Sequence, residues 1–144
     1  HDGAGAVLLA SQSAVEKFNL TARARLVAAA SSGVNPNLAP LAPIPTTKKL
    51  LAKQRLAAEE ITAVEINEAF ALKPLAFRRE FDFTAEEINA WGGALAYGHP
   101  YGASGAIILL HLLERLKHNK NRYGLATLGV AGGLGIATLI ENIE

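Results

Sequence analysis

The chain has 144 residues, which fits a single domain; 50% of them are hydrophobic and 19% are charged. This composition supplies enough apolar side chains for a full core and excludes intrinsic disorder. The formal net charge of +1 gives no electrostatic reason to expect nucleic acid or an anionic membrane surface as a partner. Because the chain has no cysteine, disulfides, thiolate metal sites and a cysteine nucleophile are excluded within it, and we expect no metal site.

Neither a signal peptide nor a membrane span is expected. No charged region followed by an apolar region opens the chain. The longest apolar runs, such as Ala106 to Leu110, fall well short of the roughly 18–20 residues that a spanning helix needs. A small domain that needs no disulfide suits the cytoplasm, which is the location we expect. Since residue 1 is His1 and not Met, we also expect that a longer polypeptide was cut or trimmed here.

The N-terminal part of the chain predicts two strands and one helix. Residues Gly3 to Ala10 are small and then aliphatic, which predicts a buried strand. Ser11 can cap a helix over Gln12 to Phe18, and Ala24 to Ala30 predicts a second strand. Ser31 to Pro45 is expected to be a loop, because it contains a glycine and four prolines.

The middle of the chain predicts a helix, a strand and another helix. The first helix runs from Thr46 to about Ala57. Val64 to Asn67 alternates apolar and polar residues, so that its two apolar side chains share one face and Glu65 lies on the other. A helix follows to about Phe81.

The C-terminal part predicts a glycine-rich loop, a long helix and two strands. The loop covers Trp91 to Ala103, and Ser104 is a good N-cap for the helix Gly105 to His118, whose leucines and isoleucines recur at helical spacing. Leu125 to Val130 and Ile136 to Ile140 predict the two strands. The order of these elements along the chain predicts a layered α/β domain.

The first segment that could carry chemistry is Asn67-Glu68-Ala69-Phe70, at the end of a strand and just before a helix. A carboxamide at this place can orient a water or a carbonyl without titrating. The alternative is that Asn67 caps the helix, which is a common use of asparagine.

The second segment is the glycine-rich loop around His99. Pro100 favours an extended backbone at His99, while Gly98 and Gly102 allow the chain to turn sharply and to approach a ligand. A histidine held in this way, just ahead of a helix, can exchange protons near neutral pH or donate a hydrogen bond to a developing oxyanion. The alternative is an ordinary histidine in a surface loop.

The third segment is Gly129 to Gly135, which joins the last two strands. A strand-like run follows it, whereas a dinucleotide-binding fingerprint opens a helix, so that fingerprint is excluded. Glycine-rich turns between strands can expose backbone N–H groups that bind an anion. The alternative is a plain hairpin turn.

Five stretches, taken in this order, resemble the C-terminal half of the thiolase family, which includes acetyl-CoA acetyltransferases and 3-ketoacyl-CoA thiolases. These enzymes make or cleave 3-ketoacyl-CoA by Claisen chemistry. Each stretch is weakly specific by itself, but the order and the spacing together are typical of the family. The stretches are Asp2 to Ala4, Pro43 to Thr47, Glu65 to Phe70, Gly92 to Gly105 and Arg122 to Thr127.

The resemblance implies roles for two side chains. His99 stands at the family's histidine, which helps to activate a nucleophilic cysteine and contributes to an oxyanion hole for the acyl-CoA thioester. Asn67 stands at the asparagine that holds a water in the same hole. Coenzyme A thioesters would then be the substrates, with no further cofactor.

The resemblance also shows departures from the family pattern. Gly129 stands in the place of the cysteine that acts as acid and base, so no side chain at this position can move a proton. Ala131 replaces a glycine whose N–H lines a second oxyanion hole, and Gly132 follows it as in the family; the angle of that N–H changes if the site needs a positive φ. Trp91 stands where the family usually has asparagine, and its ring could narrow the site.

The resemblance implies the architecture and the partners. Residues 1–144 would form the thiolase C-terminal domain, an α/β domain with a mixed five-stranded sheet and helices on both faces. The missing N-terminal half would supply the nucleophilic cysteine and most of the CoA-binding region. Gly105 to Leu116 would be buried on all sides in the intact protein, so that an isolated half would expose apolar surface and self-associate, and we expect a homo-oligomer.

Three interpretations of function remain open from the sequence. The first is the C-terminal domain of a thiolase-type acyltransferase that is inactive as an isolated chain. The second is a degenerate, non-catalytic thiolase-like domain that acts in assembly or in acyl-CoA binding. The third is a relative with a two-histidine condensing site, against which the Asn67 segment argues, because such sites usually have a histidine there.

Overall fold

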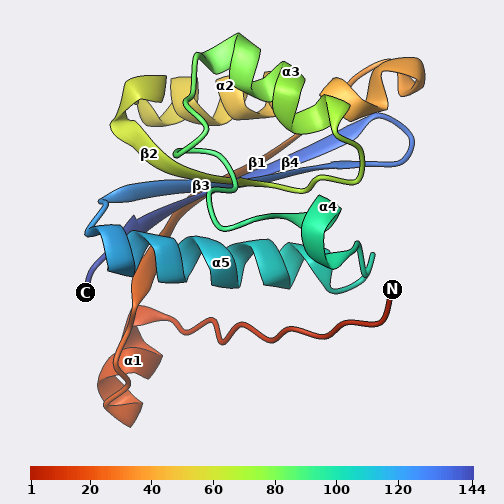
Figure 1. The fold of residues 1–144 in the computed structure, drawn as a ribbon. Coiled ribbons are helices and arrows are strands. Elements are labelled where there is room, and N and C mark those ends of the chain that lie inside the picture. The colour runs from red at the N-terminus through yellow and green to blue at the C-terminus, as the bar shows by residue number, and fades with distance from the viewer.

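The computed structural model describes all 144 residues and contains one mixed four-stranded sheet (Figure 1). In spatial order the strands are β1 (Ala24–Gly33), β4 (Leu134–Asn142), β3 (Tyr123–Val130) and β2 (Ile61–Ile66). β2 pairs with β3 in parallel, whereas β4 pairs antiparallel with both of its neighbours. The predicted α/β class with a mixed sheet is therefore confirmed.

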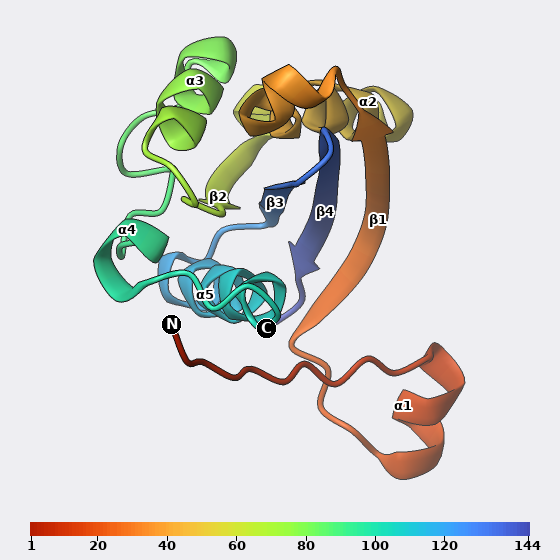
Figure 2. The ribbon, with the colours of Figure 1, turned by 90° about the vertical axis from the view of Figure 1, so that its right-hand side faces the viewer.

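Helices cover both faces of the sheet, as expected (Figures 1 and 2). The helices α2 (Pro43–Gln54) and α3 (Leu72–Phe81) lie on one side, and α5 (Ser104–Asn119) lies on the other. The apolar core is divided in the same way. Val64 and Ile66 of β2 belong to the core cluster that includes α2 and α3, while Ala63 packs with the buried residues of α5. The predicted alternation of apolar and polar side chains in this strand is thus confirmed.

Two expectations about strands are wrong. The sheet has four strands and not five, with only an isolated parallel bridge between Val64 and Ile88 beside it. Residues Gly3 to Ala10 are extended but exposed and pair with no strand; Leu8 and Leu9 are 83% and 74% exposed. These residues have the composition of a buried strand, but no strand of this chain has a free edge beside them. They run instead along the outer side of α5 (Figure 2).

The remaining elements are short. α1 (Gln12–Phe18) is capped by Ser11 as predicted and has no buried residue. The predicted loop before α2 contains a 3-10 segment, Pro36–Leu41, and another one, Ala58–Glu60, precedes β2. The loop ahead of α5 contains α4 (Ala94–Tyr97). None of the helices has the length and hydrophobicity of a membrane-spanning segment.

Two predicted helix starts need correction. α2 begins at Pro43 and not at Thr46, because a proline in the first turn has no intrahelical N–H to lose. Ser104 is the first residue of α5 and not its N-cap; its hydroxyl donates to the carbonyl of Pro100 instead of accepting from a helix N–H. Burial of α5 on all sides is expected for the intact protein and stays a prediction, whereas this chain alone is expected to leave part of the helix uncovered. Its sheet-facing residues are buried, while the outer face is only partly covered.

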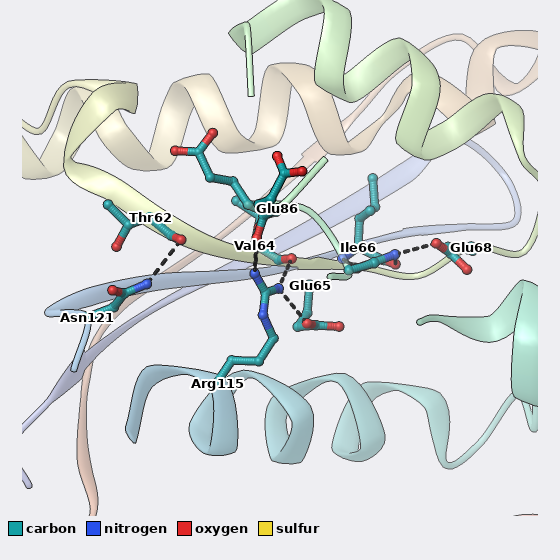
Figure 3. Close-up of polar contacts among 10 residues, drawn as sticks. Thr62, Val64, Glu65, Ile66, Glu68, Glu86, Arg115 and Asn121 are labelled. Carbon is teal, nitrogen blue, oxygen red and sulfur yellow. Dashed lines mark hydrogen bonds and ion pairs between the residues drawn. The ribbon is translucent and has the colours of Figure 1, made fainter. Parts of the chain in front are cut away.

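A buried ion pair joins α5 to β2 and to the segment that follows α3 (Figure 3). Arg115 is fully buried, and its guanidinium donates to the Glu65 carboxylate at 2.7 Å. The same guanidinium donates to the backbone carbonyls of Val64, Glu86 and Glu87 at 2.9–3.0 Å. Arg115 therefore fixes the distance between the helix, the strand and the loop that leads to the glycine-rich segment. The sequence placed Glu65 on the correct face, but did not reveal its partner.

We expect Arg115→Met to lower the free energy of unfolding by ~3–5 kcal/mol above pH 7, because it leaves the Glu65 carboxylate buried without a partner. Chemical denaturation of the chain measures this. The matched control is Arg122→Met, which removes an exposed ion pair with Glu141 and should leave the free energy of unfolding almost unchanged. Equal losses in the two variants would contradict the role of Arg115.

Burial raises the pKa of Glu65 from its ordinary value of 4.5 to about 7, against the opposing effect of Arg115. The folded state thus holds this proton more tightly than the unfolded state does. The resulting stabilisation is complete below pH 4.5 and is lost as the pH rises through about 7. We expect the stability of the wild-type chain to fall over this range relative to Glu65→Gln, measured by denaturation at several pH values. Parallel stability curves would contradict the assignment.

Candidate active site at the carboxyl ends of β2 and β3

The site lies where two neighbouring parallel strands end. Asn67 follows β2 directly, and its backbone N–H donates to the carbonyl of Thr127 on β3 at 3.0 Å. Because the two strands are parallel, their carboxyl ends lie at the same edge of the sheet. This edge therefore holds Asn67 beside the last residues of β3, which include Gly129.

The glycine-rich loop delivers His99 to Asn67. The Asn67 Nδ2 and the His99 Nε2 are 3.3 Å apart, although 32 positions separate the two residues in the sequence. The Asn67 side chain does not cap the helix that follows; α3 begins at Leu72 without a side-chain cap. Asn67 is only 3% exposed, and its Oδ1 has no hydrogen-bond partner. The prediction that this carboxamide and this imidazole converge is confirmed.

The hydrogen bonds around His99 define its neutral tautomer. The Ser104 hydroxyl donates to the carbonyl of Pro100 at 3.1 Å, so its proton is not available to the imidazole. The His99 Nδ1 lies 2.6 Å from the same hydroxyl oxygen. Nδ1 must therefore carry a proton and donate it to that oxygen. The lone pair of Nε2 is then free to accept from the Asn67 amide. The nitrogen that faces Asn67 is the one that can take up a proton.

The surroundings of His99 favour the neutral ring. Burial lowers the pKa of His99, and the positive charge of Lys73 lowers it further. The ring of Tyr101 packs edge-on against the imidazole, with 4.5 Å between the ring centroids. A neutral imidazole of fixed orientation is suited to act as a base.

Glu68 and Asn89 connect the two segments that carry Asn67 and His99. Asn89, in a left-handed conformation, pairs through its side chain with both the N–H and the C=O of Ile66. Its amide also donates to Glu68 at 2.7 Å, and the other Glu68 oxygen accepts from the N–H of Leu95. A Cβ at Gly93 would lie 2.4 Å from the Glu68 carboxylate, so this position has room only for glycine. Sequence analysis missed these roles, although Glu68 stands within a motif and Asn89 comes three residues before the glycine-rich one.

The two glycines predicted to shape the loop behave differently. Gly98 has φ +96°, in the left-handed region, as expected for a sharp turn that precedes His99. Gly102 has no positive φ, and no atom lies within 4 Å of the place where its Cβ would be, so a close approach to this chain is not seen there. With Pro100 and Tyr101, Gly102 lines an open hollow of about 530 Å³ beside the N-terminal residues.

Comparison with known proteins decides the family. The family model described as "Thiolase, C-terminal domain" matches residues 20–142. The chain belongs to the thiolase family. The β-ketoadipyl-CoA thiolase of Pseudomonas aeruginosa is 45% identical to it over 145 residues, which are 99% of this chain and 36% of that protein. The acetyl-CoA acetyltransferase of Escherichia coli is 43% identical over 144 residues, which are 100% of this chain and 36% of that protein.

Solved thiolase structures match the fold. The human mitochondrial 3-ketoacyl-CoA thiolase superposes with a TM-score of 0.90 and 38% identity, over 94% of this chain and 34% of that one. A structure of the same human enzyme in complex with CoA gives the same values. This thiolase C-terminal domain thus spans about a third of the length of the relatives that it matches.

Gly129 lies near the end of β3, and Ala131 and Gly132 lie in the hairpin turn that joins β3 to β4. Its left-handed residues are Gly132 and Gly133, so Ala131 has an ordinary backbone conformation and brings no strain. No hydrogen bond joins Ala131 or Gly132 to Asn67 or His99. The hairpin interpretation is confirmed, while an oxyanion-binding role for these N–H groups stays a prediction.

Trp91 does not narrow this thiolase site. Its ring packs edge-on against His118, with 5.4 Å between the ring centroids. His118 lies in the last turn of α5, whereas His99 lies just before the first turn of that helix. The 16 residues of α5 rise about 1.5 Å each, so the end of the helix that Trp91 contacts lies roughly 20 Å from the end next to His99. The expectation about Trp91 is wrong because the backbone turns the ring away from the loop.

Lys73 is a further residue of the site that sequence analysis missed. It lies in the first turn of α3, is 6% exposed, and donates from Nζ to the carbonyl of Gly129 at 3.2 Å. Its closeness to His99 shows in the lowered pKa of that imidazole. The only signal in the sequence was a lysine directly before Pro74 in an otherwise apolar stretch.

We expect Ser104→Ala to shift the neutral His99 imidazole from the Nδ1–H form toward the Nε2–H form, because the acceptor of the Nδ1 proton is removed. The ¹⁵N chemical shifts of the labelled ring measure the tautomer. Ser13→Ala, at an exposed position of α1, is the control and should leave the ring unchanged. An unchanged tautomer in Ser104→Ala would contradict the hydrogen-bond chain described above.

Proposed function

We propose that this chain supplies the Asn67–His99 part of an active site for acyl transfer on acyl-CoA thioesters, by Claisen condensation or thiolysis. The contact of 3.3 Å between the Asn67 amide and the His99 Nε2 carries this proposal. Two separate turns deliver these groups to one place at the sheet edge, and both side chains are held by neighbours rather than free to rotate.

The chemistry of the two groups suits a thioester. The lone pair of His99 Nε2, which faces the Asn67 amide in this chain, can accept the proton of a nucleophilic thiol in its place. The resulting N–H then faces the place where negative charge develops on the thioester oxygen. The unpartnered Oδ1 of Asn67 can accept a hydrogen bond from a water whose second O–H points to the same oxygen.

The proposal includes a second half of the protein. The relatives are about three times as long as this chain, and the chain has no cysteine that could serve as nucleophile. We propose that an N-terminal thiolase half supplies the thiol and most of the CoA-binding surface. The exposed apolar segment from Val7 to Leu9 is consistent with cover by further protein, including a homo-oligomer. A cytoplasmic location and the absence of a cofactor besides CoA stay predictions.

A chimera tests this function. This chain replaces the matching 36% of the Escherichia coli acetyl-CoA acetyltransferase, and acylation of the chimera by radiolabelled acetyl-CoA is measured. We expect His99→Gln to lower the acylation rate by ~100-fold or more, because the base and the oxyanion donor are lost. His118→Gln, far from the site, is the matched control and should acylate like the parent chimera.

The isolated 144-residue chain, assayed beside the chimera, should not cleave acetoacetyl-CoA. Cleavage by the isolated chain would overturn the need for a second half. A parent chimera that is not acylated, or that is acylated equally with His99→Gln, would point instead to a non-catalytic domain that acts in assembly or acyl-CoA binding.

A further inference from the structure

The Lys73 amine lies beside the position that a side chain at residue 129 would occupy. A Cβ built on Gly129 would lie 3.5 Å from the Nζ of Lys73. The other two of the three nearest heavy atoms are the carbonyl oxygen of Ala39 at 3.1 Å and the Cδ of Pro43 at 3.3 Å, neither of which can exchange a proton. Lys73 Nζ is therefore the titratable group at the position where the thiolase pattern has its acid–base cysteine.

The surroundings keep this amine without a counter-charge. Lys73 forms no ion pair, and its hydrogen-bond acceptor is the neutral carbonyl of Gly129. The 3-10 segment Pro36–Leu41 that packs against α3 has no charged residue, nor have Gly129 to Leu134. The charged side chains at the other end of α3 lie away from the amine: Arg78 donates to Phe83, Glu80 pairs with Lys48, and Arg79 is exposed to solvent. His99 is the titratable group that shares its site.

An uncompensated buried amine is costly as an ammonium ion, and proteins use this cost to obtain a neutral lysine. Burial lowers the pKa of Lys73. A carboxylate nearby would reverse this effect, but none is in contact. The arrangement is the one that prepares a lysine to accept a proton from a weak carbon acid.

We propose that Lys73 is the group that moves a proton to and from the α-carbon of the acyl-CoA substrate, in place of the cysteine that Gly129 replaces. This assignment depends on the proposed acyl-transfer function.

The proposed step balances as follows. The lone pair of neutral Nζ takes the proton from the α-carbon, the C–H electron pair forms the C=C bond of the enolate, and the carbonyl electron pair moves to the thioester oxygen near His99. The enolate carbon then bonds to the acyl carbonyl on the nucleophilic thiol of the N-terminal half, and the C–S bond breaks. The ammonium of Lys73 returns its proton to the thiolate that leaves, so no oxidant or reductant is needed.

The position of the amine can be tested in the 144-residue chain itself. The chain has no cysteine, so Gly129→Cys introduces a single thiol whose ionisation is visible in the ultraviolet absorbance. We expect this thiol to ionise at lower pH in Gly129→Cys than in Gly129→Cys combined with Lys73→Gln, because the neutral amine can take up the thiol proton and the ammonium so formed stabilises the thiolate. Equal ionisation in both variants would show that Nζ does not face residue 129 and would overturn the assignment.

The chemical role is tested in the chimera, by exchange of the acetyl-CoA α-protons with deuterium from the solvent. We expect Lys73→Gln to slow the exchange by ~100-fold or more and Lys73→Arg to do the same, since arginine does not lose its proton at accessible pH. Acylation should proceed in both variants and shows that they fold. Lys49→Gln is the control, because Lys49 is an exposed residue of α2 whose amine donates to the carbonyl of Ser31 and not to a group of the site. Gly129→Cys should restore exchange to the Lys73→Gln chimera.

The outcomes separate the two proposals. A parent chimera that is not acylated contradicts the acyl-transfer function and this assignment with it. A chimera that is acylated, but whose exchange is unaffected by Lys73→Gln, contradicts the assignment of Lys73 alone. Loss of exchange that Gly129→Cys does not restore indicates a structural lysine and overturns the assignment as well.

Discussion

The parallel pairing of β2 with β3 is the constraint from which the site follows. It brings the carboxyl ends of the two strands to one sheet edge, so that Asn67 and the last residues of β3 are neighbours although about 60 residues separate them in the chain. The backbone hydrogen bond from Asn67 to Thr127 extends this pairing one residue beyond β2. The turns that follow the two strands therefore share this edge, and His99 reaches Asn67 there from the glycine-rich loop.

Buried polar groups hold this edge in place. Arg115 ties α5 to β2 and to the loop after α3, and Asn89 and Glu68 tie the glycine-rich segment to the end of β2. These contacts are made in surroundings with little water, where each unpaired partner would be costly. The loop that carries His99 is therefore positioned by an interior network and not by its own conformation alone.

If Lys73 moves the proton, as we propose, the catalytic role has passed to a residue on another element of the thiolase fold. The thiolase pattern has a cysteine at residue 129, and this chain has a glycine there. The amine of Lys73, which belongs to α3, lies next to the position of that cysteine side chain. A proton carrier need only be near the reacting carbon, and its place in the sequence is free. This explains how a site can retain the chemistry while losing the motif residue.

By itself, the sequence determined the alternation in β2, the long amphipathic helix and the convergence of Asn67 with His99, the last through its resemblance to the thiolase motifs. These features depend on local periodicity and on short motifs, which are visible along one chain. The tertiary structure alone decided that Gly3 to Ala10 has no strand partner, that Trp91 points to His118, that Arg115 pairs with Glu65 and that Lys73 faces Gly129. Each of these depends on which residues become neighbours when the layers pack, and contacts across 50 or more positions leave no periodic signal in the sequence.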